Sequence, residues 1–135
     1  MIHLTPEQHV FVTERHLATL TTTRPDGTPH VVPVGFTWDA GQGVIRITTR
    51  HTSAKVRNIE AATADGGTSR AAVCQVDGGR WLTFEGTIAV ARDQDEVHEA
   101  MRRYAVRYRT LTEDPRRVVL RLTVDRVMGS AYMTR

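Results

Sequence analysis

The feature that most constrains this chain is a succession of short β-branched segments separated by turns of glycine, proline and aspartate. Residues 17–23, LATLTTT, alternate partly between apolar and polar side chains, as a strand with one buried face does. The turn PDGTP at 25–29 then closes a hairpin onto a second predicted strand at 30–38. Such a pattern favours an antiparallel sheet.

Four later segments have the same character. They are residues 44–49, 71–76, 81–90 and 118–125. Capping patterns predict three helices: residues 6–14, a short helix that begins at Thr52 or Ser53, and a longer one after Asp93. Residues 61–70 are rich in Gly, Ala, Thr and Asp and are predicted to be a loop. Six strands with hairpin connections and three helices predict a mainly β, antiparallel barrel or sandwich in one domain, residues 1–135.

Three residues inside the predicted strands carry further information. Pro33 cannot donate a ladder hydrogen bond, so its strand is predicted to lie at a sheet edge or to bulge. Gly35 leaves space for a close approach of backbone or ligand, and Gly86 predicts a bulge.

The helix after Asp93 is predicted to be amphipathic. Its apolar face is formed by Val97, Ala100, Met101, Tyr104, Ala105 and Tyr108, which repeat at spacings of three and four. Its polar face carries Glu99, Arg102, Arg103 and Arg107.

The composition argues against several classes of binding partner. A net charge of +3 with dispersed acids and only 6% aromatic residues argues against nucleic acid, because no basic run is interleaved with aromatics for stacking on bases. No segment is long and apolar enough to span a bilayer, and no signal pattern or clustered metal ligands occur, so neither membrane nor metal is expected. The single cysteine, Cys74, excludes an intrachain disulfide and favours a cytoplasmic protein.

The segment 48–55, TTRHTSAK, has the composition of an anion site. A strand end supplies hydroxyl groups, a helix start supplies free backbone N–H groups, and Arg50, Lys55 and Arg57 supply positive charge. Lys55 is the only lysine among the eighteen basic residues, which hints at a specific need for an ammonium group. An ordinary capped surface helix has the same spacing, and the residues alone leave both readings open.

The usual catalytic motifs do not occur in the sequence. It contains no glycine-rich phosphate loop, no nucleophile elbow and no histidine pair at metal-binding spacing. If the chain is an enzyme, its chemistry is therefore expected to come from a cofactor, and no catalytic residue of its own is predicted. The interior of so small a barrel is filled by side chains, so the cofactor must bind on the outside or at an interface.

The order of several segments resembles the pyridoxamine 5'-phosphate oxidase-like split β-barrel proteins, and among them the F420-dependent oxidoreductase branch. The resemblance is carried by PDGTPH with VVPVGF, by TT-x3-SAK-x2-N, by QVDGGRWLTFEG and by a helix that ends in RRYAVRY. It extends from about Leu17 to Gly129. The segment 61–70 departs from the pattern because it is longer, which bears on the substrate more than on the cofactor.

The resemblance implies a six-stranded antiparallel split β-barrel with short peripheral helices. It also implies a homodimer with cofactor sites at the interface, and hydride transfer from reduced F420 to a conjugated small molecule such as a bilin. The deazaflavin ring would lie against backbone groups of His30, Val31, Val32, Pro33, Val34 and Gly35. The phosphate would be held by Thr48, Thr49, Ser53, Ala54 and Lys55, with Arg50, Arg57 and Asn58 near the glutamate tail. The partner subunit would close the site with Gln75, Val76, Asp77 and Gly78, and Arg80 would bind substrate carboxylates.

Two alternatives stay open. The same fold binds FMN, but the sequence does not contain the C-terminal segment with tryptophan and arginine that the oxidases use for pyridoxal phosphate. A non-catalytic protein that stores F420 or a tetrapyrrole would equally lack acid and base residues.

Overall fold

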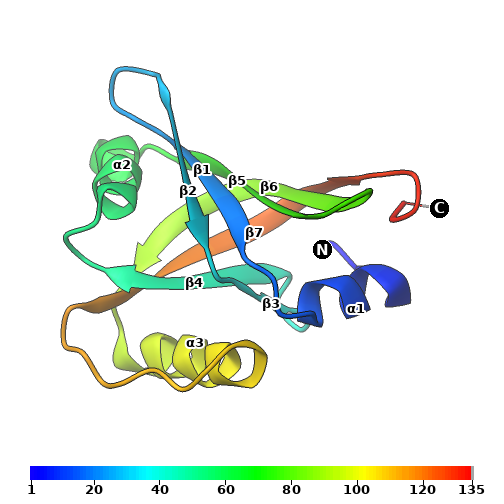
Figure 1. Ribbon diagram of the computed structural model, residues 1–135. Coiled ribbons are helices and arrows are strands. Elements are labelled where there is room, and N and C mark those ends of the chain that lie inside the picture. Colours follow the sequence, from blue (N-terminus) through cyan, green and yellow to red (C-terminus); the bar gives the residue numbers. More distant parts are fainter. Residues whose placement is uncertain (135) are drawn as a thin grey trace.

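One seven-stranded antiparallel sheet organises the computed structural model, which describes residues 1–134 (Figure 1). The strands are β1 (Ala18–Thr23), β2 (Pro29–Val34), β3 (Thr37–Asp39), β4 (Val44–Arg50), β5 (Ser69–Asp77), β6 (Arg80–Ala91) and β7 (Arg117–Gly129). They follow the order β2-β1-β5-β6-β7-β4-β3 in space. The mainly β, antiparallel architecture predicted from the sequence is confirmed.

The sheet has one strand more than predicted, because the segment 30–38 forms two strands. β2 ends at Val34 and β3 begins at Thr37, so the chain crosses from one edge of the sheet to the other at Gly35 and Phe36. Among the described residues, β2 pairs only with β1, and β3 only with β4. Pro33 therefore lies in an edge strand, as predicted, opposite Thr19 of β1.

Three α-helices surround the sheet: α1 (Pro6–Thr13), α2 (Ala54–Thr63) and α3 (Gln94–Arg107). Their predicted caps are confirmed, with the side chains of Thr5, Ser53 and Asp93 accepting from the backbone of Gln8, Val56 and Glu96 at 3.2, 3.4 and 3.1 Å. Among residues 1–134, no helix combines the length and the apolar character needed to cross a membrane.

The predicted loop at 61–70 is largely wrong. α2 continues through Ala61 and Ala62 to Thr63, because alanine favours the helix. A short 3-10 helix (Ala64–Gly66) follows, and β5 begins at Ser69. Only residues 67 and 68 connect the two elements without regular structure.

The interior of the curved sheet is filled by side chains of the strands, of α1 and of α2. The largest of the fully buried apolar ones are Phe11, Phe36, Phe84, Leu20, Ile45, Ile47, Ile59, Leu82, Leu120 and Leu122. Trp38 stacks on Phe84 with ring centroids 5.9 Å apart. A ligand must therefore bind outside this core, as the sequence predicts.

The bulge predicted at Gly86 is confirmed. The β6–β7 register shifts between Glu85 and Gly86. A Cβ atom at Gly86 would lie only 1.9 Å from the carbonyl oxygen of Thr123, so the two strands can approach only because this residue has no side chain.

Arg107, assigned to the polar face of α3, instead points into the protein. Its Nε donates to the carbonyl of Glu14 at 2.9 Å and its Nη1 to the carbonyl of Phe36 at 2.6 Å. Its Nη2 donates to Gln75 Oε1 at 2.7 Å and to the carbonyl of His16 at 3.4 Å. Gln75, which is fully buried, donates in turn to the carbonyl of Phe11 at 2.8 Å. These bonds join α3 to β5, to the end of α1 and to the β2–β3 crossing.

We predict that Arg107→Met lowers the free energy of unfolding by about 3 kcal/mol, because it leaves buried oxygen atoms without a donor. Gln75→Leu should also destabilise the fold. The two changes together should cost less than the sum of the single costs by at least about 1 kcal/mol, since the residues share a hydrogen bond. Urea unfolding measures all three variants. As the control, Arg102→Met on the exposed side of α3 should stay within about 0.5 kcal/mol of the parent. Equal stability of the Arg102 and Arg107 variants would contradict the assignment.

Candidate functional site

A polar cleft of about 520 Å³ lies at the end of β4. It is bordered by the segment that leads into α2 and by the segment that precedes β7. Its walls are formed by Thr49, Arg50, Thr52, Ser53, Arg109, Leu111, Thr112, Asp114 and Arg117. Thr49, Arg50 and Ser53 belong to the anion segment predicted from the sequence, and the structure brings them together.

The cleft carries an excess of positive charge. Its lining contains three arginines and one aspartate, which leaves a surplus of two positive charges. Arg50 lies directly opposite Arg117 in the β4–β7 register, an arrangement of like charges that costs stability unless an anion compensates it. Arg117 Nε is buried and has no acceptor within residues 1–134. The cleft is thus built to receive an anion.

Asp114, the one acidic residue of this lining, is already held by another arginine, which lies outside the lining. The Arg116 guanidinium, bonded to both carboxylate oxygens at 3.0 Å, keeps the pKa of Asp114 far below its usual range. The carboxylate therefore stays ionised. Its distance of 3.5 Å to Arg50 Nε makes a second, looser ion pair.

Lys55 lies in the first turn of α2, two residues after the capping Ser53. Partial burial lowers the pKa of its ammonium group. No carboxylate or hydrogen-bond acceptor within residues 1–134 pairs with it. The first intrahelical bond of α2 is donated by Arg57 to the Ser53 carbonyl, so the amides of Ala54 and Lys55 are free as well. An unpaired, partly desolvated cation beside free amides favours a bound anion.

The predicted ring-binding strand, His30–Val34, is the edge strand β2. Its outer edge has no neighbouring strand, which leaves main-chain groups free for a ligand. Val31 is 56% exposed, whereas His30 Nδ1 is buried and has no partner in the described chain. Gly35 was expected to leave space for backbone or a ligand, but the groups that lie close to it are two tyrosine rings. A Cβ there would lie 3.0 Å from the ring of Tyr104 and 3.2 Å from that of Tyr108, so the glycine makes room for α3.

Two predicted site residues have side chains that point inward. Gln75 is bonded to Arg107 and Phe11 inside the protein. Asn58 is 7% exposed and donates to Thr22 Oγ1 at 3.1 Å. Neither side chain is therefore free for a ligand. Their positions do not support the roles expected for them, Asn58 near the glutamate tail and Gln75 in the segment by which the partner subunit closes the site.

The remaining predicted residues are placed as follows. Thr48 lies half-buried near the end of β4, and Arg57 donates to the carbonyl of Thr52 at 2.6 Å. Val76, Asp77 and Gly78 are exposed at the end of β5 opposite to Ser69. A φ of +59° at Gly78 shows why a glycine occupies this turn.

Arg80, predicted to bind substrate, already has two acidic partners. It donates to both oxygens of Glu14 at 3.0 Å and also to Asp77. His16 Nε2 lies 3.5 Å from Glu14 and 3.7 Å from Asp77, which makes a group of potential metal ligands. Because Arg80 occupies these carboxylates, the group has a structural explanation, and the expected absence of a metal stays a prediction.

Sequence reasoning missed Arg109 and Arg117. The available signal was the density of arginines around the Asp114-Pro115 turn. It did not suffice, because the pairing of Arg117 with Arg50 depends on the register between two strands that are far apart in the sequence.

Comparison with known proteins places this geometry in a family. The family model for pyridoxamine 5'-phosphate oxidase matches residues 4–130. The F420H(2)-dependent biliverdin reductase of Mycobacterium tuberculosis (strain CDC 1551 / Oshkosh) is 46% identical over 128 residues, which cover 95% of this chain and 89% of that protein.

Solved structures agree on the fold. A structure named F420 reductase superposes with a TM-score of 0.71 at 24% identity, over 89% of this chain and 94% of that one. General Stress Protein 26 from Bacillus anthracis str. Sterne gives 0.71 at 19% identity, over 92% of each chain. The chain belongs to the pyridoxamine 5'-phosphate oxidase family of split β-barrel proteins.

Proposed function

We propose that this chain is a reductase that uses the reduced deazaflavin F420H2 to reduce a conjugated acceptor, with biliverdin as the first candidate. The observation that carries the proposal is the 46% identity, over nearly the whole chain, to a reductase of that description. The cationic cleft supports it independently, because F420 carries a phosphate and a glutamate tail.

The described residues fit such a cofactor. Lys55 and the amides at the start of α2 suit a phosphate, since this ammonium group has no other partner among residues 1–134. Arg50, Arg109 and Arg117 suit the carboxylates of the tail, because guanidinium groups bind carboxylates in a planar, bidentate manner. The free edge of β2 is then left for the ring.

When bound, reduced F420 supplies the hydride from C5 of its ring. The chain itself contributes position and charge. The β2 backbone would hold the ring in a fixed position, and the cleft would hold the glutamate tail at the opposite end of the cofactor. No acid or base of the chain is required for this transfer.

FMN is the nearest alternative, and the family match supports it as well. FMN has a single phosphate and would leave most cations of the cleft unpaired. A protein that only stores F420 or a tetrapyrrole is the third possibility, which turnover distinguishes.

A homodimer forms part of the proposal. The face of β1, β2 and β5 opposite to the core presents threonines on β1, Pro29, Val31 and Pro33 on β2, and Arg70, Ala72, Cys74 and Val76 on β5. Leu17, Val31 and Val76 are 61, 56 and 57% exposed there. A second copy on this face would bury these side chains and bring Val76–Gly78 toward the other subunit's cofactor. A cytoplasmic location, and the expected absence of nucleic-acid, membrane and metal partners, stay predictions.

The first prediction tests the cofactor and the reaction together. The purified protein should bind F420 at least about tenfold more tightly than FMN. The reason is that the arginines of the cleft can bind the glutamate tail of F420, which FMN does not have. Biliverdin should oxidise the F420H2 that is bound to the protein. Quinones and nitroaromatics serve as comparison acceptors. Fluorescence titration and absorbance measure the two steps. Tight FMN binding without F420 binding would reject the choice of cofactor, and F420 binding without turnover would favour storage.

The second prediction concerns the cations. Lys55→Ala and Arg117→Gln should each weaken F420 binding by about tenfold or more, since each removes a charge-assisted hydrogen bond. The hydride step of the saturated complex should change by less than about threefold, because neither residue reaches the ring. Stopped-flow oxidation at saturating cofactor separates the two effects. Arg15→Gln, an exposed arginine outside the cleft, is the matched control and should bind normally. Unchanged affinity in both the Lys55 and the Arg117 variant would remove the roles assigned to these residues.

The third prediction concerns assembly. The double change Val31→Asp with Val76→Asp should convert a dimer into a monomer, because it buries carboxylates in an apolar contact. Analytical ultracentrifugation measures the mass. Val106→Asp adds the same charge on α3, at a residue that is 83% exposed, and should leave the dimer intact. A parent protein that sediments as a monomer would refute the dimer.

A further inference from the structure

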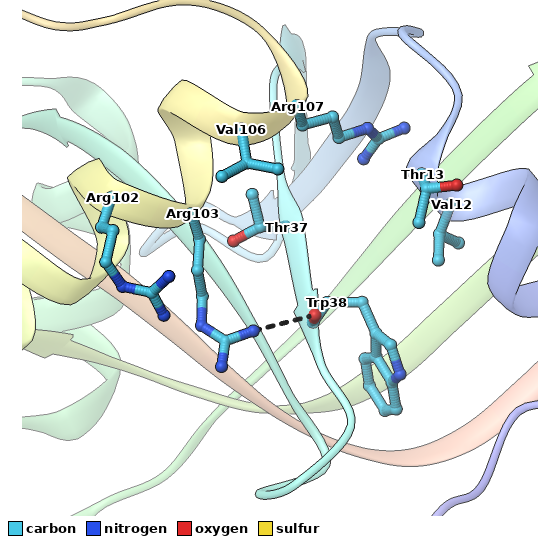
Figure 2. Close-up of a pocket in the computed structure, with 8 residues that line it drawn as sticks. All are labelled: Val12, Thr13, Thr37, Trp38, Arg102, Arg103, Val106 and Arg107. Carbon is cyan, nitrogen blue, oxygen red and sulfur yellow. Dashed lines mark hydrogen bonds between the residues drawn. The ribbon is translucent and has the colours of Figure 1, made fainter.

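A second cavity, of about 250 Å³, lies between α3, β3 and the end of α1 (Figure 2). It is lined by Val12, Thr13, Thr37, Trp38, Arg102, Arg103, Val106 and Arg107. None of these residues lines the cationic cleft at the end of β4. None was assigned to the cofactor either.

The charged groups of this cavity are all positive. Its lining includes three arginines of α3 and no acidic residue. Arg103 makes only long contacts, at 3.3 Å to Asp39 Oδ2 and to Glu99 Oε2, and at 3.4 Å to the carbonyl of Trp38. Figure 2 shows Arg102 and Arg103 side by side at one end of the cavity. Arg102 donates from Nε and Nη2 to the two carboxylate oxygens of Glu99 at 2.7 and 2.9 Å, so its Nη1 is the donor left for a ligand carboxylate, beside the loosely held guanidinium of Arg103.

Thr37 supplies the observation that points to a ligand. The residue is only 7% exposed, and its hydroxyl group is buried without a hydrogen-bond partner among residues 1–134. In Figure 2 the hydroxyl points toward the side of the cavity that holds Arg102 and Arg103. A buried hydroxyl without a partner is costly, so an acceptor that enters the cavity would remove a penalty present in the free protein.

The rest of the lining is formed by Val12, Val106, Trp38, Thr13 and Arg107, whose guanidinium is bonded inside the protein. Val12 is buried, whereas Val106 is 83% exposed at the rim. Thr13 directs its hydroxyl to the carbonyl of Val10 at 2.7 Å, and that hydroxyl is not available to a ligand. The volume falls below the roughly 300–1,000 Å³ of sites for drug-sized ligands, so it suits one ring with a single acidic group.

We propose that this cavity binds a small aromatic carboxylate. The carboxylate lies between Arg102, Arg103 and the Thr37 hydroxyl, and the ring contacts Val12 and Val106. The site does not depend on the F420 assignment, since it shares no lining residue with the cleft and makes no use of β2.

Benzoate and its neutral analogue benzyl alcohol test the proposal on the cofactor-free protein. Benzoate should bind at least about tenfold more tightly than the alcohol, because only the carboxylate forms charge-assisted bonds with the arginines. Calorimetry measures the affinities. Amide NMR shifts at Arg103 and Val106 locate the ligand, and they should be absent at Thr49 and Ser53.

Two variants sharpen the test. Val106→Asp places a carboxylate at the rim and should weaken benzoate binding at least about tenfold, whereas Val10→Asp, on the exposed side of α1, should not change it. Thr37→Val keeps the shape and removes the hydroxyl. It should weaken benzoate about fivefold without lowering the melting temperature, because this hydroxyl bonds to nothing in the free protein.

Three results would overturn the proposal. They are benzoate binding weaker than about 10 mM, equal binding of benzoate and benzyl alcohol, and amide shifts confined to the cleft at the end of β4.

Discussion

The buried guanidinium of Arg107 is the contact on which the rest of this structure depends. No carboxylate within residues 1–134 forms an ion pair with it, and its partners are the carbonyls of Glu14, His16 and Phe36 with the amide oxygen of Gln75. It also lies 4.5 Å above the centre of the Phe36 ring. Burial lowers the pKa of Arg107, but from so high a starting value that the group stays charged. Dipoles of oriented carbonyls replace the hydration that the charge has lost.

This arrangement fixes the point where the chain changes edges of the sheet. The neighbouring Tyr108 accepts a hydrogen bond from the Phe36 amide at 3.2 Å and donates one to the His16 carbonyl at 2.7 Å. The last residue of α3 and its C-cap residue thus bond to the same two segments. The break between β2 and β3 is therefore defined by helix contacts, and β2 remains a free edge with Gly35 packed below the tyrosine rings. The same helix leads directly into Arg109 and the segment that lines the cationic cleft.

The sequence predicted what depends on local chemistry. The strands other than the division between β2 and β3, the three helix caps, the edge position of Pro33 and the bulge at Gly86 all follow from the residues themselves and their near neighbours. The sequence-based predictions failed where contacts with residues distant along the chain determine whether a side chain is buried. The spacing of three and four placed Arg107 on the polar face of the helix, whereas four oxygen atoms from three other segments make its burial possible. Gln75 and Asn58 were taken for ligand contacts, yet the same polar groups satisfy buried donors and acceptors.

The distribution of charge, more than its total, distinguishes the two cavities from the remaining surface. Arg46 is almost fully buried between Asp39 at 2.7 Å and Glu96 at 2.6 Å, and Glu96 also binds Arg121. The opposite charges of such pairs largely cancel, so the pairs contribute little to the electrostatic field outside the protein. The net charge of +3 is therefore concentrated at cations that have no such partner, Lys55 and Arg117 among them. A pI near 9.6 alone suggests a polyanion such as nucleic acid. Three other arginines, Arg50, Arg109 and Arg117, gather in one cleft of about 520 Å³, a size that suits a small anionic ligand better than a polynucleotide.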